Sequence, residues 1–143
     1  MHVLVTGANG HVGNNLCRAL VERGYRVRAS VRSLDDPAKS APLRDLPHVD
    51  IIDLDVRDAA RFDAAVDGIE VLFHVAATYA LYTGSREKDE EMVRDSVEGV
   101  ENALRSAARR RVRRARKRVQ HDDEGRASTC HWRTRSGRAL VRP

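Results

Sequence analysis

The chain has 143 residues, which is the size of about one domain. Its net charge of +5 conceals a division, because residues 1–108 carry 13 Lys and Arg against 18 Asp and Glu, whereas residues 109–143 carry 13 against 3. No apolar run is long enough to cross a membrane, the N-terminus has no signal-peptide pattern, and two cysteines indicate neither a disulfide framework nor a metal site. We therefore expect a cytoplasmic protein without a metal.

Apolar patterning predicts the first elements of the chain. A continuous apolar run predicts a buried strand over residues 2–6. Apolar residues on one face predict a helix over residues 12–23, which Gly24 ends. Alternation over residues 25–31 predicts a second strand, and three prolines within residues 32–48 predict a loop.

Strand and helix patterns continue to alternate along the next part of the chain. Residues 49–54 and 70–77 predict two further strands, separated by a short helix over residues 59–66 that Asp58 caps. Apolar residues that step by four and three predict a long helix near residues 88–108. This alternation predicts an α/β fold, namely the N-terminal part of a doubly wound parallel sheet (Rossmann fold), followed by an irregular basic tail.

A glycine-rich turn joins the first predicted strand to the first helix. Its three glycines stand where the chain leaves the strand, where backbone can approach a phosphate, and where the helix packs closely on the sheet. The unpaired N–H groups at a helix N-terminus attract an anion. The turn therefore predicts a pyrophosphate site rather than a tight turn without a ligand, and its candidate binding residues are Gly7, Asn9, Gly10, His11, Val12 and Gly13.

Four motifs within residues 1–108 resemble those of the extended short-chain dehydrogenases/reductases, which include NAD-dependent epimerases, dehydratases and dihydroflavonol-reductase-like enzymes. The resemblance implies that Asp55 and Val56 contact adenine, although Asp55 could instead cap the next helix. It also implies that Ala76 and Ala77 lie on the nicotinamide side of the site. Ser96 stands where the fourth motif usually begins with Asn. The motifs are Thr6-Gly7-x-x-Gly10-x-x-Gly13, Asp55-Val56-x-Asp58, Phe73-His74-Val75-Ala76-Ala77 and Val97-Glu98-Gly99-Val100-Glu101-Asn102-Ala103-Leu104.

The end of the second predicted strand indicates which dinucleotide the site prefers. Enzymes that use NAD place an acidic residue about 20 residues past the glycine motif, whereas this chain has Arg32. A guanidinium can bind a 2′-phosphate through charge-assisted, bidentate bonds, so we expect NADP rather than NAD. The alternative is that Asp35 or Asp36 serves NAD and that Arg32 is a solvated charge of the loop.

The catalytic residues that the resemblance implies do not occur in this sequence. The family pairs a tyrosine with a lysine four residues later, and the lysine lowers the tyrosine pKa for proton transfer. We therefore predict no catalytic residue, and interpret the chain as the NAD(P)-binding portion of an oxidoreductase or epimerase whose intact relatives act on a small-molecule substrate. The residues four positions after Tyr25, Tyr79 and Tyr82 are Ala29, Thr83 and Arg86.

The arginine-rich tail over residues 109–143 differs in composition from the NAD(P)-binding domain over residues 1–108. Residues 109–118 lack apolar periodicity, where the family has a strand that ends in Ser-Ser. One allowed coding of residues 117–125, read one base later, gives Asn-Val-Ser-Ser-Thr-Met-Thr-Lys. We therefore hypothesise that the tail is disordered or derives from a frameshift that truncated a reductase.

Two other interpretations of the tail remain open. A nucleotide-binding module could carry a basic arm for nucleic acid or an acidic partner, since clustered arginines bind phosphates in a salt-sensitive way. No recognition fold accompanies the arginines, so nucleic acid is not the expected partner. The chain could also be a non-functional product whose truncation leaves the fourth strand with an open edge.

Overall fold

The computed structural model describes residues 1–35, 37–77, 84–117, 131–135 and 138–140. Strands and helices alternate from the N-terminus through α4, and three strands follow it. The elements are β1 (His2–Thr6), α1 (His11–Glu22), β2 (Arg26–Val31), α2 (Pro37–Arg44), β3 (Val49–Asp53), α3 (Ala59–Ala65), β4 (Val71–His74), α4 (Arg86–Arg109), β5 (Arg114–Lys117), β6 (His131–Arg135) and β7 (Arg138–Leu140).

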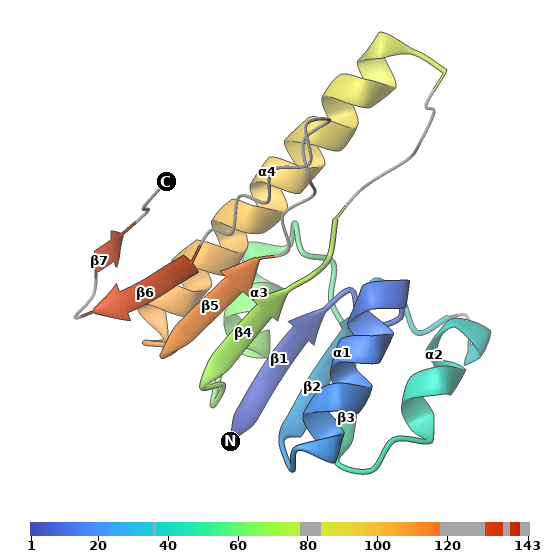
Figure 1. Cartoon of the computed structure of the whole chain (residues 1–143). Helices are drawn as coiled ribbons and strands as arrows, with labels where there is room; N and C mark the ends of the chain where they lie inside the picture. The colour runs from blue at the N-terminus through green and yellow to red at the C-terminus, as the bar shows by residue number, and fades with distance from the viewer. Residues whose placement is uncertain (36, 78–83, 118–130, 136–137, 141–143) are drawn as a thin grey trace, which may run out of the picture.

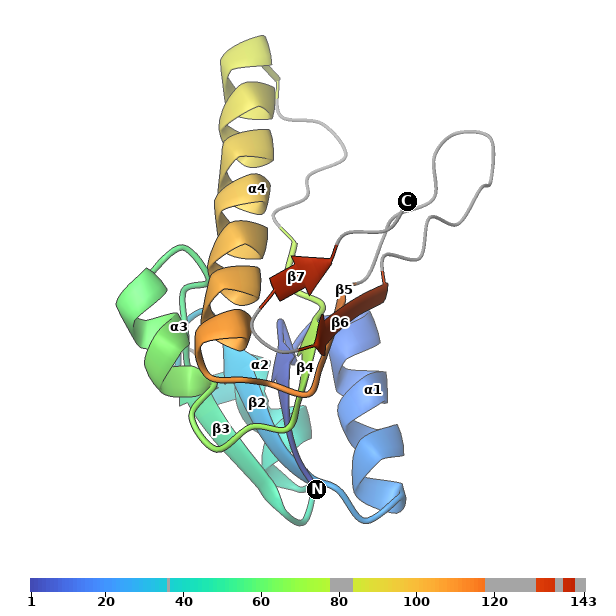
Figure 2. The ribbon, with the colours of Figure 1, turned by 90° about the vertical axis from the view of Figure 1, so that its left-hand side faces the viewer.

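The strands form one sheet in the order β3-β2-β1-β4-β5-β6-β7 (Figure 1). Strands β1 to β5 run parallel, whereas β6 pairs antiparallel with both β5 and β7. Helices α1 and α2 cover one face of the sheet, and α3 and α4 cover the other (Figure 2). This arrangement confirms the predicted doubly wound α/β sheet.

A separate apolar core lies on each face of the sheet. Successive residues of a strand point to opposite faces, so Leu4 packs in the core under α3 and α4, and Val5 packs in the core under α1 and α2. Burial on both faces is the reason why β1 reads as a continuous apolar run. Cys17 is fully buried in the second core, where burial raises the pKa of its thiol to about 12.

Helix α2 lies within the residues 32–48 that were predicted to form a loop. It begins at Pro37, a position where proline is tolerated because the first N–H groups of a helix lack intrahelical partners. Pro42 lies inside the helix, but the burial of Leu43 against the sheet offsets this defect. The predicted loop is therefore wrong over these residues.

Strand β5 lies where an irregular tail was predicted. It pairs in parallel with β4, so β4 does not have the open edge that the interpretation as a truncated product implied. Val112 and Ala115 are buried in the core under α3 and α4, and the Arg113 N–H donates to the Glu70 carbonyl oxygen at 2.9 Å. These two apolar side chains stabilise the strand but are too few to produce a recognisable period.

About half of the predicted basic tail, including residues 118–130, lies outside the residues that the structure describes. Tyr79 and Tyr82 also lie outside them. Among the described helices, none is both long enough and apolar enough to span a bilayer.

Candidate functional site

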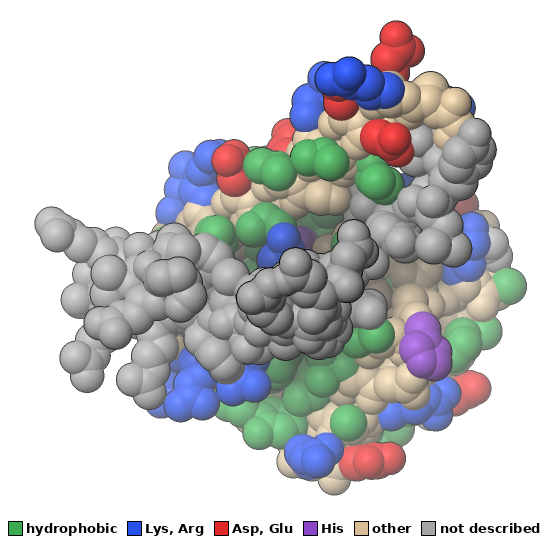
Figure 3. Space-filling view, turned by 45° about the horizontal axis from the view of Figure 1, so that its top comes forward, with side chains coloured by type: hydrophobic (Ala, Val, Ile, Leu, Met, Phe, Trp, Pro, Cys, Tyr) green, Lys and Arg blue, Asp and Glu red, His purple; other side chains and the backbone are tan. Residues whose placement is uncertain are grey.

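A cavity of about 630 Å³ opens at the carboxyl ends of β1 to β4. Figure 3 looks toward this end of the sheet. The size is that of a small-molecule site, and ligands of open α/β sheets bind at this end. All of the predicted binding residues except Asp55 line the cavity, together with three that were not predicted, Lys39, Leu54 and Val75.

The glycine turn between β1 and α1 forms one wall of the cavity. Gly7 has a φ of +66°, and a Cβ there would lie 2.8 Å from the Ala76 Cα. A Cβ on Gly13 would overlap the Gly7 carbonyl oxygen. The N-cap of α1 is Gly10, which has no side chain that could accept the first N–H groups of the helix. The turn thus brings bare backbone and a helix N-terminus to the cavity, which suits a phosphate.

A hydrogen-bonded clamp joins the glycine turn to the end of β4. The Thr6 hydroxyl oxygen accepts the N–H groups of Val75 and Ala76, each at 3.1 Å. Because a hydroxyl has two acceptor sites and one proton, Thr6 must donate that proton to His74 Nδ1, which lies 3.0 Å away. His74 is then neutral and protonated on Nε2.

The surroundings of His74 favour the same neutral state. Burial, followed by the positive charge of Lys117, lowers the pKa of His74 to about 4. His74 does not line the cavity. Its imidazole therefore supports the wall that Val75 and Ala76 provide.

Among the residues that line the described part of the cavity, Arg32 and Lys39 carry the charged side chains. Arg32 follows β2, as predicted, and Lys39 comes from α2. Asp35, one candidate for binding NAD, instead accepts the Ser33 hydroxyl at 2.7 Å. The other candidate, Asp36, lies outside the described residues. The lining therefore favours an anion near Arg32 and Lys39.

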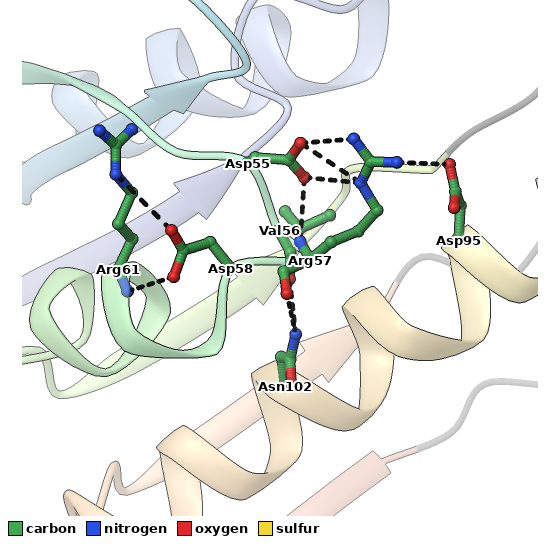
Figure 4. Close-up of polar contacts among 7 residues, drawn as sticks. All are labelled: Asp55, Val56, Arg57, Asp58, Arg61, Asp95 and Asn102. Atoms are coloured by element: carbon green, nitrogen blue, oxygen red, sulfur yellow. Dashed lines mark hydrogen bonds and ion pairs between the residues drawn. The ribbon is translucent and has the colours of Figure 1, made fainter.

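Asp55 points toward Arg57 rather than into the cavity (Figure 4). Arg57 Nη2 lies 2.7 Å from Asp55 Oδ2, and both Nε and the backbone N–H of Arg57 donate to Oδ1 at 3.0 Å. These hydrogen bonds lower the pKa of Asp55 to about 2. The cap of α3 is Asp58, whose carboxylate accepts the Arg61 N–H at 3.0 Å. Within the segment from Asp55 to Asp58, Val56 is therefore the residue that lines the cavity.

Sequence reasoning missed three residues of the lining for two reasons. Leu54 and Val75 directly follow β3 and β4, so their positions at the carboxyl ends of parallel strands were a usable signal. Lys39 gave no such signal, because it reaches the cavity only through α2, the helix that the prolines obscured.

The sheet order, the glycine turn and the cavity at the carboxyl ends of the strands define a dinucleotide-binding protein of the doubly wound α/β class. The model of the NAD dependent epimerase/dehydratase family matches residues 3–119. The chain belongs to this family and carries its NAD(P)-binding portion. The match extends through β5, which agrees with the position of that strand in the parallel sheet.

Individual relatives agree with this assignment. Dihydroflavonol 4-reductase from Dianthus caryophyllus is 37% identical over 116 residues, which are 78% of this chain and 32% of the reductase. The crystal structure of gox2253 is 32% identical with a TM-score of 0.69, and covers 86% of this chain and 37% of that one. The chain therefore spans about a third of the length of the curated relatives it matches.

More distant structures share the fold. Yeast methylglyoxal/isovaleraldehyde reductase Gre2, solved with NADPH, has a TM-score of 0.66 at 22% identity and covers 80% of this chain and 36% of that one. WbmH from Bordetella bronchiseptica, solved with NAD⁺, has a TM-score of 0.64 at 22% identity. The match covers 80% of this chain and 37% of WbmH. The fold accordingly occurs with either dinucleotide.

Proposed function

We propose that the chain binds NADPH in preference to NADH, with the 2′-phosphate between Arg32 and Lys39. The observation that carries this proposal is that two cationic side chains, Arg32 and Lys39, line the cavity near the end of β2. Two ammonium or guanidinium groups stabilise a phosphate dianion, whereas an NAD site needs an acceptor for the ribose hydroxyls.

The other predicted residues are assigned along the same dinucleotide. Gly7, Gly10 and Gly13, with the backbone of Asn9, His11 and Val12, hold the pyrophosphate at the N-terminus of α1. Val56 packs against the adenine, and Ala76 and Ala77 lie beside the nicotinamide ribose. Asp55 acts through Arg57 and does not contact the adenine, because its carboxylate already accepts the hydrogen bonds of Arg57.

Isothermal titration of the chain with NADPH and with NADH tests the preference. We expect NADPH to bind more tightly, and Arg32→Ala to weaken NADPH about tenfold or more while leaving NADH nearly unchanged, since hydrogen bonds to charged groups contribute about 1.5–3 kcal/mol. Arg26→Ala is the matched control, because this exposed arginine begins β2 at the opposite end of the strand. Equal affinity of the wild-type chain for both dinucleotides, or an unchanged preference in Arg32→Ala, would refute the proposal.

We further propose that this chain binds the dinucleotide without catalysing hydride transfer, and that the family's oxidoreductase or epimerase reaction on a small molecule needs residues that the printed sequence lacks. The support is the missing Tyr-x-x-x-Lys pair, since proton transfer must accompany hydride transfer. Incubation with NADPH and a dihydroflavonol should leave the absorbance at 340 nm constant. Steady oxidation of NADPH that depends on the dihydroflavonol would contradict this part of the proposal.

A further inference from the structure

We propose that one face of α4 positions the adenine end of the site by holding the Asp55–Arg57 loop, and that Asn102 is the main positioning residue. The inference rests on the placement of the dinucleotide proposed above. It assigns a binding role to a helix whose described residues do not line the cavity.

Asn102 fixes the backbone of this loop. Its side-chain amide nitrogen donates to the carbonyl oxygens of Val56 at 3.2 Å and Arg57 at 2.9 Å (Figure 4). An amide nitrogen has two protons, so both are used on consecutive peptide groups. Asn102 is only 5% exposed, and the carbonyl groups that it binds belong to the Val56–Arg57 and Arg57–Asp58 peptide bonds, the first of which joins a cavity residue to its neighbour.

Two other residues on the same face of α4 hold the same loop. Gly99 lies one turn before Asn102, and a Cβ there would approach Val56 Cγ2 to 2.8 Å, so the glycine leaves room for the valine to pack against the helix. Asp95 lies one turn further back and accepts Arg57 Nη1 at 3.1 Å. Residues spaced by three and four share a helix face. Here that face contacts Val56 and Arg57, the two loop residues that follow Asp55.

These contacts with α4 fix the position of Val56 in the cavity wall. Arg57 joins the Asp55 carboxylate to Asp95 of α4, so the acidic side chain is held away from the cavity and Val56 forms the wall. Without the amide of Asn102, two carbonyl groups would lose their partners and the loop would adopt other conformations. The apparent affinity for adenine would fall by the factor by which the competent loop conformation is depleted.

Binding of two halves of the dinucleotide separates this role from general stability. We would titrate the chain with 2′,5′-ADP, which carries the adenine, and with reduced nicotinamide mononucleotide, which does not, and follow both by NMR. We expect Asn102→Ala to weaken 2′,5′-ADP about tenfold and the mononucleotide by less than about twofold. Ser106→Ala is the matched control: it lies one turn further along the same face but hydrogen-bonds Asp63 of α3, so it should change neither affinity.

The other possible outcomes of this experiment also have defined consequences for the proposal. Equal weakening of both ligands by Asn102→Ala, or no weakening of either, overturns the positioning role of α4. If the wild-type chain binds neither ligand, the proposed cofactor site fails, and this inference fails with it. If circular dichroism shows that Asn102→Ala is unfolded, Gly99→Ala decides, since its Cβ displaces Val56 without removing a hydrogen bond: a selective loss of 2′,5′-ADP supports the proposal, and an unchanged affinity overturns it.

Discussion

Replacement of Gly13 by alanine should destabilise the glycine turn by overlap alone. Gly13 does not have a positive φ, so alanine can adopt its backbone conformation. The added Cβ would overlap the Gly7 carbonyl oxygen and would lie 2.8 Å from the Ala8 Cα and 2.9 Å from the Gly7 carbonyl carbon. All three are backbone atoms, so no flexible side chain can move aside. We expect the free energy of unfolding to fall by about 3 kcal/mol, which is the upper part of the range for overpacked sites.

Urea unfolding followed by circular dichroism measures this loss, and Gly24→Ala provides the comparison. Gly24 has a φ of +76° with nothing within 4 Å of its Cβ position, so alanine there adds only about 1–2 kcal/mol of backbone strain. Gly13→Ala should also abolish NADPH binding, whereas Gly24→Ala should leave it intact because the residue is distant from the cavity lining. The reasoning would be refuted if Gly13→Ala had a free energy of unfolding within about 0.5 kcal/mol of wild type and still bound NADPH.

Three further predictions concern other parts of the chain. Because the pKa of His74 is about 4 in the folded chain against 6.5 for an ordinary histidine, the unfolded chain takes up the proton first, and stability should fall by up to about 3 kcal/mol as pH drops from 6.5 to 4. His74→Asn, which keeps an acceptor for the Thr6 hydroxyl, should flatten this dependence in urea unfolding; an unchanged slope would show that other groups cause it. The buried Cys17 thiol, with its raised pKa, should resist iodoacetamide at pH 8 until urea unfolds the chain, as peptide mass spectrometry would show, and rapid labelling of the folded chain would contradict the burial. Sequencing the coding DNA across residues 107–125 of an independent clone should reveal one base gained or lost, with a restored frame that encodes Ser-Ser and a later Tyr-x-x-x-Lys, whereas an intact frame would refute the frameshift hypothesis.

The parallel sheet and the glycine turn could be predicted because their signals are local. Glycine spacing, continuous apolar runs and the step of four and three in α4 each follow from the geometry of a single element. Arg32 could be placed for the same reason, since the end of β2 is a fixed position in this type of fold.

The remaining residues of the site depend on packing that no local pattern reports. Lys39 enters the cavity because Leu43 anchors a helix that two prolines argue against. Asp55 stands at the predicted position but is turned away by Arg57 and, through it, by Asp95, which lies 40 residues further along the chain. The spacing of Asp55 and Arg57 was visible in the sequence, but their pairing with α4 was not.

The position of β1 in the middle of the five parallel strands bears on how the chain folds during synthesis. β1 leaves the ribosome before the other strands of this sheet, yet one of its edges is completed by β4, and the hydroxyl of Thr6 contacts His74, 68 residues later. At about 5–20 residues per second, this interval lasts about 3–14 s. Throughout that time β1 can pair only with β2, and its second edge is available to chaperones or to other nascent chains.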